Sequence, residues 1–235
     1  MTAPSALLEL TERDRRLLIH LYRLRILSTP QVAGLGFPTW KAAANRLAEL
    51  RGRGLVDRAR RHGTGGRSSP GYWFLTAEGL RDAEELLGVP AQRRRRPAET
   101  RYLFLHLEEL LPLNDAAVAL ERIPGCSWLT PPDSTRRFFS FLADGDTTVA
   151  FDAAVATPRG RFLIRHDRPL WPPSRWREEF LLWRELTFEA KEREDLVLPC
   201  SNPRREQLAA LLPERLQVAF PPPEQLAAWL AGPPP

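Results

Sequence analysis

The chain has 235 residues, 43% of them hydrophobic, and a formal net charge of +5 at pH 7. That composition is ordinary for a globular protein, and the length suffices for one large or two modest domains. No apolar run approaches the ~20 residues that a membrane-spanning helix needs, so we expect no membrane association. Cys126 and Cys200 are the only cysteines, and their wide spacing argues against a disulfide framework and a zinc motif. It favours a reducing cytoplasm, and the sequence predicts neither a metal nor another cofactor.

The charge is divided unevenly between the two halves of the chain. Residues 1–97 hold 18 Lys and Arg against 9 Asp and Glu, whereas residues 98–235 hold 16 against 20. A basic module attracts polyanions, of which nucleic acid is the simplest candidate. The first half therefore predicts a nucleic-acid-binding domain.

Three helices are predicted in succession in the basic half. The first runs from a cap at Thr11 to about Leu24, with leucines at helical spacing. The second lies in "STPQVAGLGF", where Ser28 or Thr29 caps the helix and glycines end it. The third lies in "PTWKAAANRLAELRGRG". Its predicted buried stripe is Trp40, Ala43, Leu47 and Leu50, and its opposite face is Lys41, Ala42, Asn45, Arg46 and Glu49.

The segment "GLVDRARRHGTGGRSSPGYWFLT", from Gly54 to Thr76, raises the question of a phosphate-binding loop. A phosphate loop of the Walker type lies between a strand and a helix and carries a lysine. Here the glycines lie between two predicted strands, "LVDRARR" and "GYWFL", and a helix capped by Thr76 follows. Three helices followed by such a hairpin are typical of a winged helix-turn-helix. In that fold the third helix enters the major groove and the hairpin, or wing, holds phosphates.

This architecture places the expected DNA contacts on the third helix, on the wing and in the following run "AQRRRRPAET". The residues are Thr39, Lys41, Asn45, Arg46, Arg58, Arg60, Arg61, His62, Arg67, Arg93, Arg94, Arg95 and Arg96. Winged helices also serve as protein-interaction modules, and exposed arginines are often only solvated surface, so this alternative stays open. The four consecutive arginines either extend the DNA footprint or form a solvated hinge.

The second half predicts a helix, several strands, and then helices alternating with strands. The helix lies in "ETRYLFLHLEELLPLNDAAVALERI", and the strands are "CSWLT", "RRFFSFLAD", "TVAFDAAVAT" and "RFLIRHD". A long helix capped by Ser174 follows. After it come "DLVLPC", "NPRREQLAALL", "LQVAF" and "PEQLAAWLA" as strand, helix, strand and helix. A mixed sheet covered by helices is the packing that this order favours.

This order resembles the core of the PD-(D/E)xK nuclease superfamily, which holds a divalent metal on carboxylates of two adjacent strands. On that resemblance, Asp152 takes the position of the first acid. If Asp167 is the later polar position, Arg165 stands two residues before it, where a carboxylate is required, because residues two apart share a strand face. No lysine follows, so we expect no metal site and no nuclease activity. His166 and Asp167 are adjacent and point to opposite faces, so we expect no acid–base pair there.

The whole chain also resembles the bacterial replication-relaxation family, in which a winged helix precedes a degenerate nuclease-like domain. The resemblance is carried by "LTERDRRLLIHLYRLRILSTPQVAGLGFPTWKAAANRLAELRGRGLV", "YWFLTAEG", "LNDAAVAL", "FDAAV", "FLIRHD" and "LVLPCSNPRREQL". The chain departs from the family pattern at Glu109, where a His five residues before Asn114 is common, and near Arg165, where an acid is expected. The resemblance implies DNA binding in plasmid replication, maintenance or transcription, without a defined reaction.

We therefore predict an α+β chain with three parts. Residues 1–90 form a winged helix-turn-helix DNA-binding domain, residues 91–99 an Arg-rich linker, and residues 100–235 an inactive, restriction-endonuclease-like α/β domain with a mixed sheet. Double-stranded DNA is the predicted partner, and a second copy of the chain and a replication or conjugation protein are further candidates. The competing interpretations are a metal-dependent DNA nuclease and an adaptor that recruits another protein.

Overall fold

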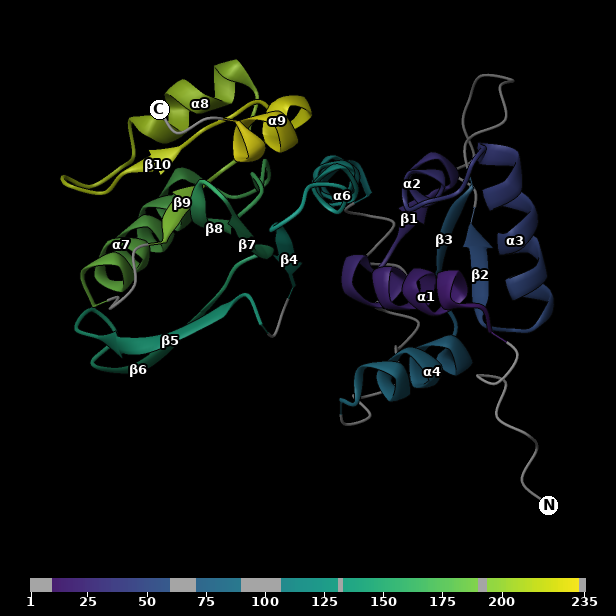
Figure 1. Ribbon diagram of the computed structural model, residues 1–235. Helices are drawn as coiled ribbons and strands as arrows, with labels where there is room; N and C mark the ends of the chain where they lie inside the picture. Colours follow the sequence, from purple (N-terminus) through teal and green to yellow (C-terminus); the bar gives the residue numbers. More distant parts are fainter. Residues whose placement is uncertain (1–9, 60–70, 90–106, 131–132, 190–193, 233–235) are drawn as a thin grey trace. The chain divides into compact units, whose positions relative to one another are not determined.

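The computed structural model describes residues 10–59, 71–89, 107–130, 133–189 and 194–232 (Figure 1). Its contacts divide the chain into unit 1 (Met1–Asn114) and unit 2 (Asp115–Pro235). Each unit combines helices with strands, which confirms the expected α+β class. No helix in the described ranges is both long and apolar enough to cross a membrane.

The boundary between the two units falls within helix α6 (Leu107–Leu120), not at the predicted linker. Leu107 packs with Ile26 and Tyr72 of unit 1, and the Asn114 side-chain amide donates to the Ile26 carbonyl at 2.6 Å. The start of α6, which the sequence pattern places in the second domain, therefore groups with unit 1. The predicted linker at 91–99 lies outside the described residues, so that part of the domain division stays a prediction.

Unit 1 is built from helices packed on a small antiparallel sheet with the strand order β1-β3-β2. In chain order its described elements are α1 (Glu12–Leu24), β1 (Leu27–Ser28), α2 (Thr29–Gly34), α3 (Trp40–Gly52), β2 (Val56–Ala59), β3 (Tyr72–Leu75) and α4 (Ala77–Leu87), followed by the start of α6. The two strands of the predicted hairpin pair as expected, with Val56 opposite Leu75 and Ala59 opposite Tyr72.

The helices of unit 1 begin where their capping residues predict. The Thr11 hydroxyl accepts from the backbone N–H of Asp14, and the Asp14 carboxylate accepts from the backbone N–H of Thr11, which forms a capping box. Ser28 and Gln31 form a second capping box at α2, and Thr39 and Thr76 cap α3 and α4 through a side-chain oxygen. These caps confirm the predicted helix starts.

The predicted burial of Trp40 in the core of unit 1 is wrong. Ala43, Leu47 and Leu50 are fully buried, but the Trp40 side chain is 67% exposed. At 3.6 residues per turn, Trp40 lies about 20° around the helix from Leu47, so the helical spacing alone places it on the apolar stripe. Trp40 is the first residue of α3 and stands on the surface, so its exposure could not be predicted from the periodicity.

Unit 2 contains a five-stranded mixed sheet and a separate two-stranded hairpin. Its elements after α6 are β4 (Ser127–Leu129), β5 (Thr135–Ser140), β6 (Gly145–Ala150), β7 (Ala153–Thr157), β8 (Gly160–Ile164), α7 (Pro173–Glu189), β9 (Asp195–Val197), α8 (Asn202–Ala209), β10 (Val218–Ala219), a 3₁₀ turn (Pro223–Gln225) and α9 (Leu226–Ala231). The sheet order is β10-β9-β8-β7-β4. Strands β8, β9 and β10 are parallel, whereas β4 and β8 are each antiparallel to β7.

Two predicted boundaries in unit 2 are wrong. The predicted strand "TVAFDAAVAT" is two strands: β6 pairs with β5, and β7 pairs with β4 and β8. The change of partner occurs at Phe151 and Asp152, where the Asp152 carboxylate bonds to other side chains. Helix α7 begins at Pro173, which removes Ser174 from the predicted capping position.

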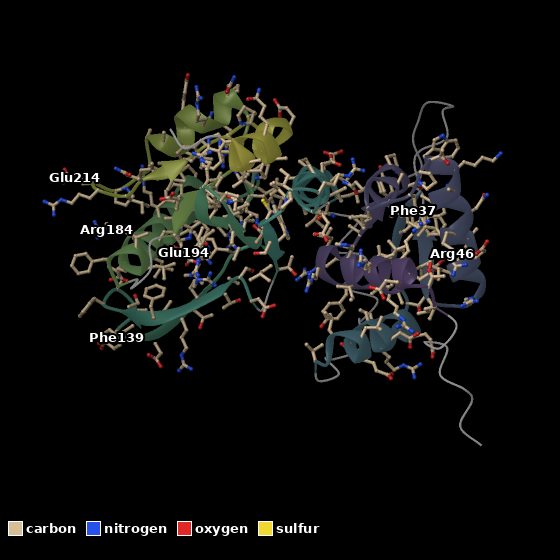
Figure 2. The ribbon with its side chains drawn as sticks, viewed as in Figure 1. Phe37, Arg46, Phe139, Arg184, Glu194 and Glu214 are labelled. Atoms are coloured by element: carbon tan, nitrogen blue, oxygen red, sulfur yellow. The ribbon has the colours of Figure 1, made fainter. Side chains whose placement is uncertain are left out.

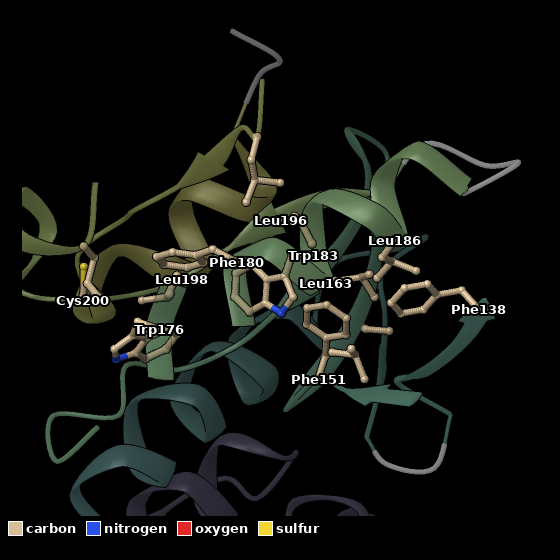
Figure 3. Packing of buried hydrophobic residues seen from close by; sticks show 14 residues of the cluster. Phe138, Phe151, Leu163, Trp176, Phe180, Trp183, Leu186, Leu196, Leu198 and Cys200 are labelled. Atoms are coloured by element: carbon tan, nitrogen blue, oxygen red, sulfur yellow. The ribbon is translucent and has the colours of Figure 1, made fainter. Parts of the chain in front are cut away.

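The core of unit 2 gathers where α7 covers the sheet and the hairpin (Figure 3). Trp176, Phe180 and Trp183 of α7 are fully buried, and Phe180 contacts both tryptophans ring to ring. Leu163 of β8 and Leu196 of β9 face them from the sheet. Burial of a large apolar side chain stabilises a fold by roughly 1.5–3 kcal/mol. This aromatic layer therefore fixes α7 and, through it, the loops at the ends of β8 and β9.

Candidate nucleic-acid interface

The exposed face of α3 carries two of the predicted DNA-contacting side chains. Lys41 and Asn45 are exposed and stand one helical turn apart, on the opposite side from the buried Ala43 and Leu47. Within the described ranges, neither side chain has a hydrogen-bond or ion-pair partner. Thr39 holds the start of this helix, because its hydroxyl accepts from the Ala42 N–H at 3.1 Å. Thr39 thus shapes the helix end that presents Lys41.

Trp40 adds an apolar ring to the same helix end. It is exposed beside Lys41, although its spacing predicts a core position. Helix α3 and the hairpin strands β2 and β3 lie side by side, and the start of α3 lies at the same end of unit 1 as the end of β2 (Figure 1). Helix α3 and the hairpin are therefore direct neighbours in unit 1.

Arg46 is tied to other side chains of unit 1. Its Nε donates to Asp14 of α1 at 2.7 Å, and it also pairs with Glu49. The Asp14 side chain is only 1% exposed. Burial raises the pKa of this carboxyl, but the hydrogen bonds from Arg46 and Thr11 lower it more, so the pKa lies below its ordinary value. The pair joins α3 to α1, a role that the sequence did not indicate.

Arg58 also packs within unit 1. It stands directly opposite Trp73 in the hairpin, and its guanidinium lies 5.4 Å from the centre of the Trp73 ring. A cation over an indole face is attracted by the ring quadrupole. The Arg58 side chain is half-buried, so it forms part of the hairpin surface and also packs against Trp73. The other predicted contacts lie outside the described residues: Arg60, Arg61, His62, Arg67, Arg93, Arg94, Arg95 and Arg96.

A second cluster of charge surrounds Asp152 in unit 2. One Asp152 oxygen accepts from the His166 backbone N–H at 3.0 Å and lies 2.9 Å from His166 Nδ1. The other oxygen accepts from Arg168 at 2.9 Å. Burial raises the pKa of Asp152, but the His166 hydrogen bond and the charges of His166, Arg168 and Arg165 outweigh it and lower the pKa to about 2. This carboxylate is therefore ionised and surrounded by donors.

The neighbours of Asp152 do not form the carboxylate pair of a metal site. Arg165 pairs with the buried Glu179 of α7 at 3.0 Å, and Asp167 accepts from Arg204 at 3.2 Å. Among the described residues, no three His, Cys, Asp or Glu side chains are grouped so that they could hold a metal ion. A divalent cation at Asp152 would face the guanidinium of Arg168 at short range and be repelled. These residues do not fit the metal that the nuclease resemblance implies.

Comparison with known proteins identifies the family. The family model for replication-relaxation proteins matches residues 18–195, which is most of the chain and includes parts of both units. The chain belongs to the replication-relaxation family. Membership in this family indicates a role in the replication of plasmids or mobile elements. No curated protein and no solved structure matches the chain.

Proposed function

We propose that this replication-relaxation protein binds double-stranded DNA through unit 1, which acts as a winged helix-turn-helix. The observation that carries the proposal is the face of α3, where Lys41 and Asn45 are exposed and unpaired within the described ranges, beside the hairpin of a strongly basic half-chain. The major groove is wide enough to admit one helix. In this proposal α3 reads the groove, the wing holds phosphates, and unit 2 serves as a scaffold.

The residues on α3 then have different roles. Asn45 suits bidentate pairing with adenine, and the exposed Trp40 ring suits contact with a thymine methyl group. Lys41 suits a phosphate or a guanine. Arg46 acts as a positioning residue, because its guanidinium holds α3 against Asp14 of α1. Its loss should weaken binding to all sequences instead of changing the preferred one.

We expect Asn45→Ala to relax sequence preference more than it lowers non-specific affinity. Each good side-chain–base pairing contributes about 1–3 kcal/mol of discrimination, which corresponds to roughly 5- to 150-fold. The measurement is selection of bound duplexes from a random pool, followed by affinity measurements on the selected sequence and on unrelated DNA. Asn202→Ala, an exposed asparagine of unit 2, is the matched control. Equal losses on both duplexes would make Asn45 a phosphate contact or a structural residue.

We also expect unit 2 not to cleave DNA. Mg²⁺ loses its water shell reluctantly and needs carboxylate ligands, whereas Asp152 is occupied by His166 and Arg168. Supercoiled plasmid incubated with the protein and Mg²⁺ or Mn²⁺ should stay supercoiled. If nicked or linear plasmid forms and Asp152→Ala abolishes it, the nuclease interpretation replaces the scaffold role.

A further inference from the structure

A cavity of about 590 Å³ opens on the surface of unit 2, away from the Asp152 cluster in the fold. Its walls come from the segment after β5, from the last turns of α7 and from the loop between α8 and β10. The lining residues are Phe141, Arg184, Glu185, Thr187, Phe188, Glu214 and Arg215. Binding sites for small molecules and short segments have volumes of this order. Figure 2 shows Arg184, Glu214 and Phe139 on the same side of the unit.

Large apolar side chains gather at this cavity without being buried. Phe188 is 88% exposed and Phe141 is 74% exposed. The rings of Phe139 and Phe141 contact each other edge to face, with their centres 5.4 Å apart, and Leu142 follows on the chain. Half of the large hydrophobic residues that are exposed in the described ranges belong to this group. Scattered exposed apolar residues are ordinary, but a contiguous group beside a cavity marks an interaction surface.

The wall formed by the β5 end is held in place before any partner binds. The Glu185 carboxylate on α7 accepts from the Ser140 hydroxyl at 2.6 Å and from the Leu142 backbone N–H at 3.1 Å. These two bonds lie on either side of Phe141 in the sequence and fasten its segment to α7. A preformed wall lowers the ordering cost of binding. The Glu185 carboxylate is therefore already hydrogen-bonded within the protein.

The remaining charges at the cavity favour an acidic partner. The side chains of Arg184 and Arg215 have no ion-pair partner within the described part of the chain. Glu214 is the one carboxylate of this lining that has no hydrogen-bond or ion-pair partner among the described residues. A basic segment would meet two guanidinium groups, whereas carboxylates would pair with them. Aromatic or aliphatic side chains would cover Phe141 and Phe188.

We propose that this cavity binds an acidic peptide segment of another protein that carries aromatic or aliphatic side chains. The site is separate from the proposed DNA-binding face and does not depend on it. A long nucleic acid is disfavoured because unit 2 as a whole holds 15 Lys and Arg against 17 Asp and Glu. A second copy of the chain is disfavoured because it would bring two arginines for each unpaired glutamate of the described lining to the contact, whereas an acidic segment brings carboxylates alone.

The test uses the full chain and a short fluorescein-labelled synthetic peptide in which Asp and Glu alternate with Phe and Leu. Fluorescence anisotropy should show saturable binding. The same peptide with Lys in place of the acids, or with Ser in place of Phe and Leu, should bind at least about tenfold more weakly. Two variants, Phe188→Ser and the double variant Arg184→Glu/Arg215→Glu, should each weaken binding by about tenfold or more. Arg177→Glu and Leu170→Ser change exposed residues outside the lining and should leave binding unchanged.

Several results would overturn the proposal. One is that the acidic peptide shows no saturable binding, and another is that the basic peptide binds as tightly as the acidic one. A third is that the control variants lose as much affinity for the acidic peptide as the cavity variants do. If the protein binds single-stranded DNA and the same variants lose that binding, the cavity is a nucleic-acid site instead. A change from dimer to monomer in Phe188→Ser, measured by sedimentation velocity, would assign the face to self-association. All substituted side chains are exposed, so each variant should fold, and circular dichroism tests this.

Discussion

Asp14→Ala should lower the free energy of unfolding by about 3–5 kcal/mol, because it removes one partner of a largely buried ion pair. The substitution leaves the Arg46 guanidinium, whose side chain is 24% exposed, without its main acceptor. It also removes the carboxylate that accepts from the Thr11 backbone N–H, which is one half of the capping box at the start of α1, while the Thr11 hydroxyl still caps the helix. Urea unfolding at pH 7 measures the change.

The control for this prediction is Glu12→Ala. Glu12 lies in the same first turn of α1 and pairs with Arg16, but both side chains are mostly exposed. Exposed pairs contribute about 0–1 kcal/mol. A double variant, Asp14→Ala/Arg46→Met, should recover part of the loss because it removes the stranded charge. If Asp14→Ala costs no more than Glu12→Ala, the pair does not hold α3 against α1.

Asp152→Asn should destabilise the protein by about 2 kcal/mol at pH 7, because each tenfold change in the proton affinity of a carboxyl corresponds to about 1.4 kcal/mol. The folded pKa of Asp152 is about 2, below its ordinary value of 3.8. A carboxyl with a lowered folded pKa contributes stability that is fully present above its unfolded pKa. That contribution is lost as the pH falls from about 4 to about 2. The difference between wild type and variant should therefore shrink over that range.

Asp146→Asn is the matched control for this pH dependence. Asp146 pairs with Arg137 at the surface, and both side chains are mostly exposed. The control should change stability little and show no special dependence over the same acidic range. A difference between wild type and Asp152→Asn that stays constant throughout that range would contradict the charge-based account of this cluster.

The local features of the fold could be read from the sequence because they depend on neighbouring residues. Thr11, Ser28, Thr39 and Thr76 start their helices through bonds to residues a few positions on. The hairpin followed from two short apolar runs that flank a glycine-rich segment. Such signals need no knowledge of distant parts of the chain.

The errors arise where distant partners decide the outcome. Burial alternates from Val149 through Phe151 to Ala153, across the break between β6 and β7, so the periodicity does not reveal that the strand changes sheets. Arg46 lies on the polar side of α3, but its acceptor, Asp14, is 32 positions away in the sequence. The role of Asp14 was hidden because an acid in the first turn of a helix is already explained by capping.

The candidate site in unit 2 could be predicted only in part. The sequence placed Arg165 beside Asp152, and the structure brings both into one charged cluster. The sequence did not reveal that His166 pairs with Asp152. Asp152 lies between β6 and β7, and His166 follows β8, so the pairing depends on how these segments meet in the fold. The cavity at Phe141 and Phe188 had no sequence signal, because exposed and buried phenylalanines look alike in a periodic pattern.

The most direct test of DNA binding by unit 1 is the salt dependence of affinity for duplex DNA. The logarithm of the binding constant should fall linearly with the logarithm of salt concentration, by about 0.9 for each phosphate contact. Arg60→Ala/Arg61→Ala should make this slope shallower by up to about 1.8, which corresponds to two lost contacts. Arg177→Ala/Arg205→Ala removes two exposed arginines of unit 2 and should leave the slope unchanged. Absence of saturable duplex binding at low salt, or equal slopes in all three proteins, would contradict the account.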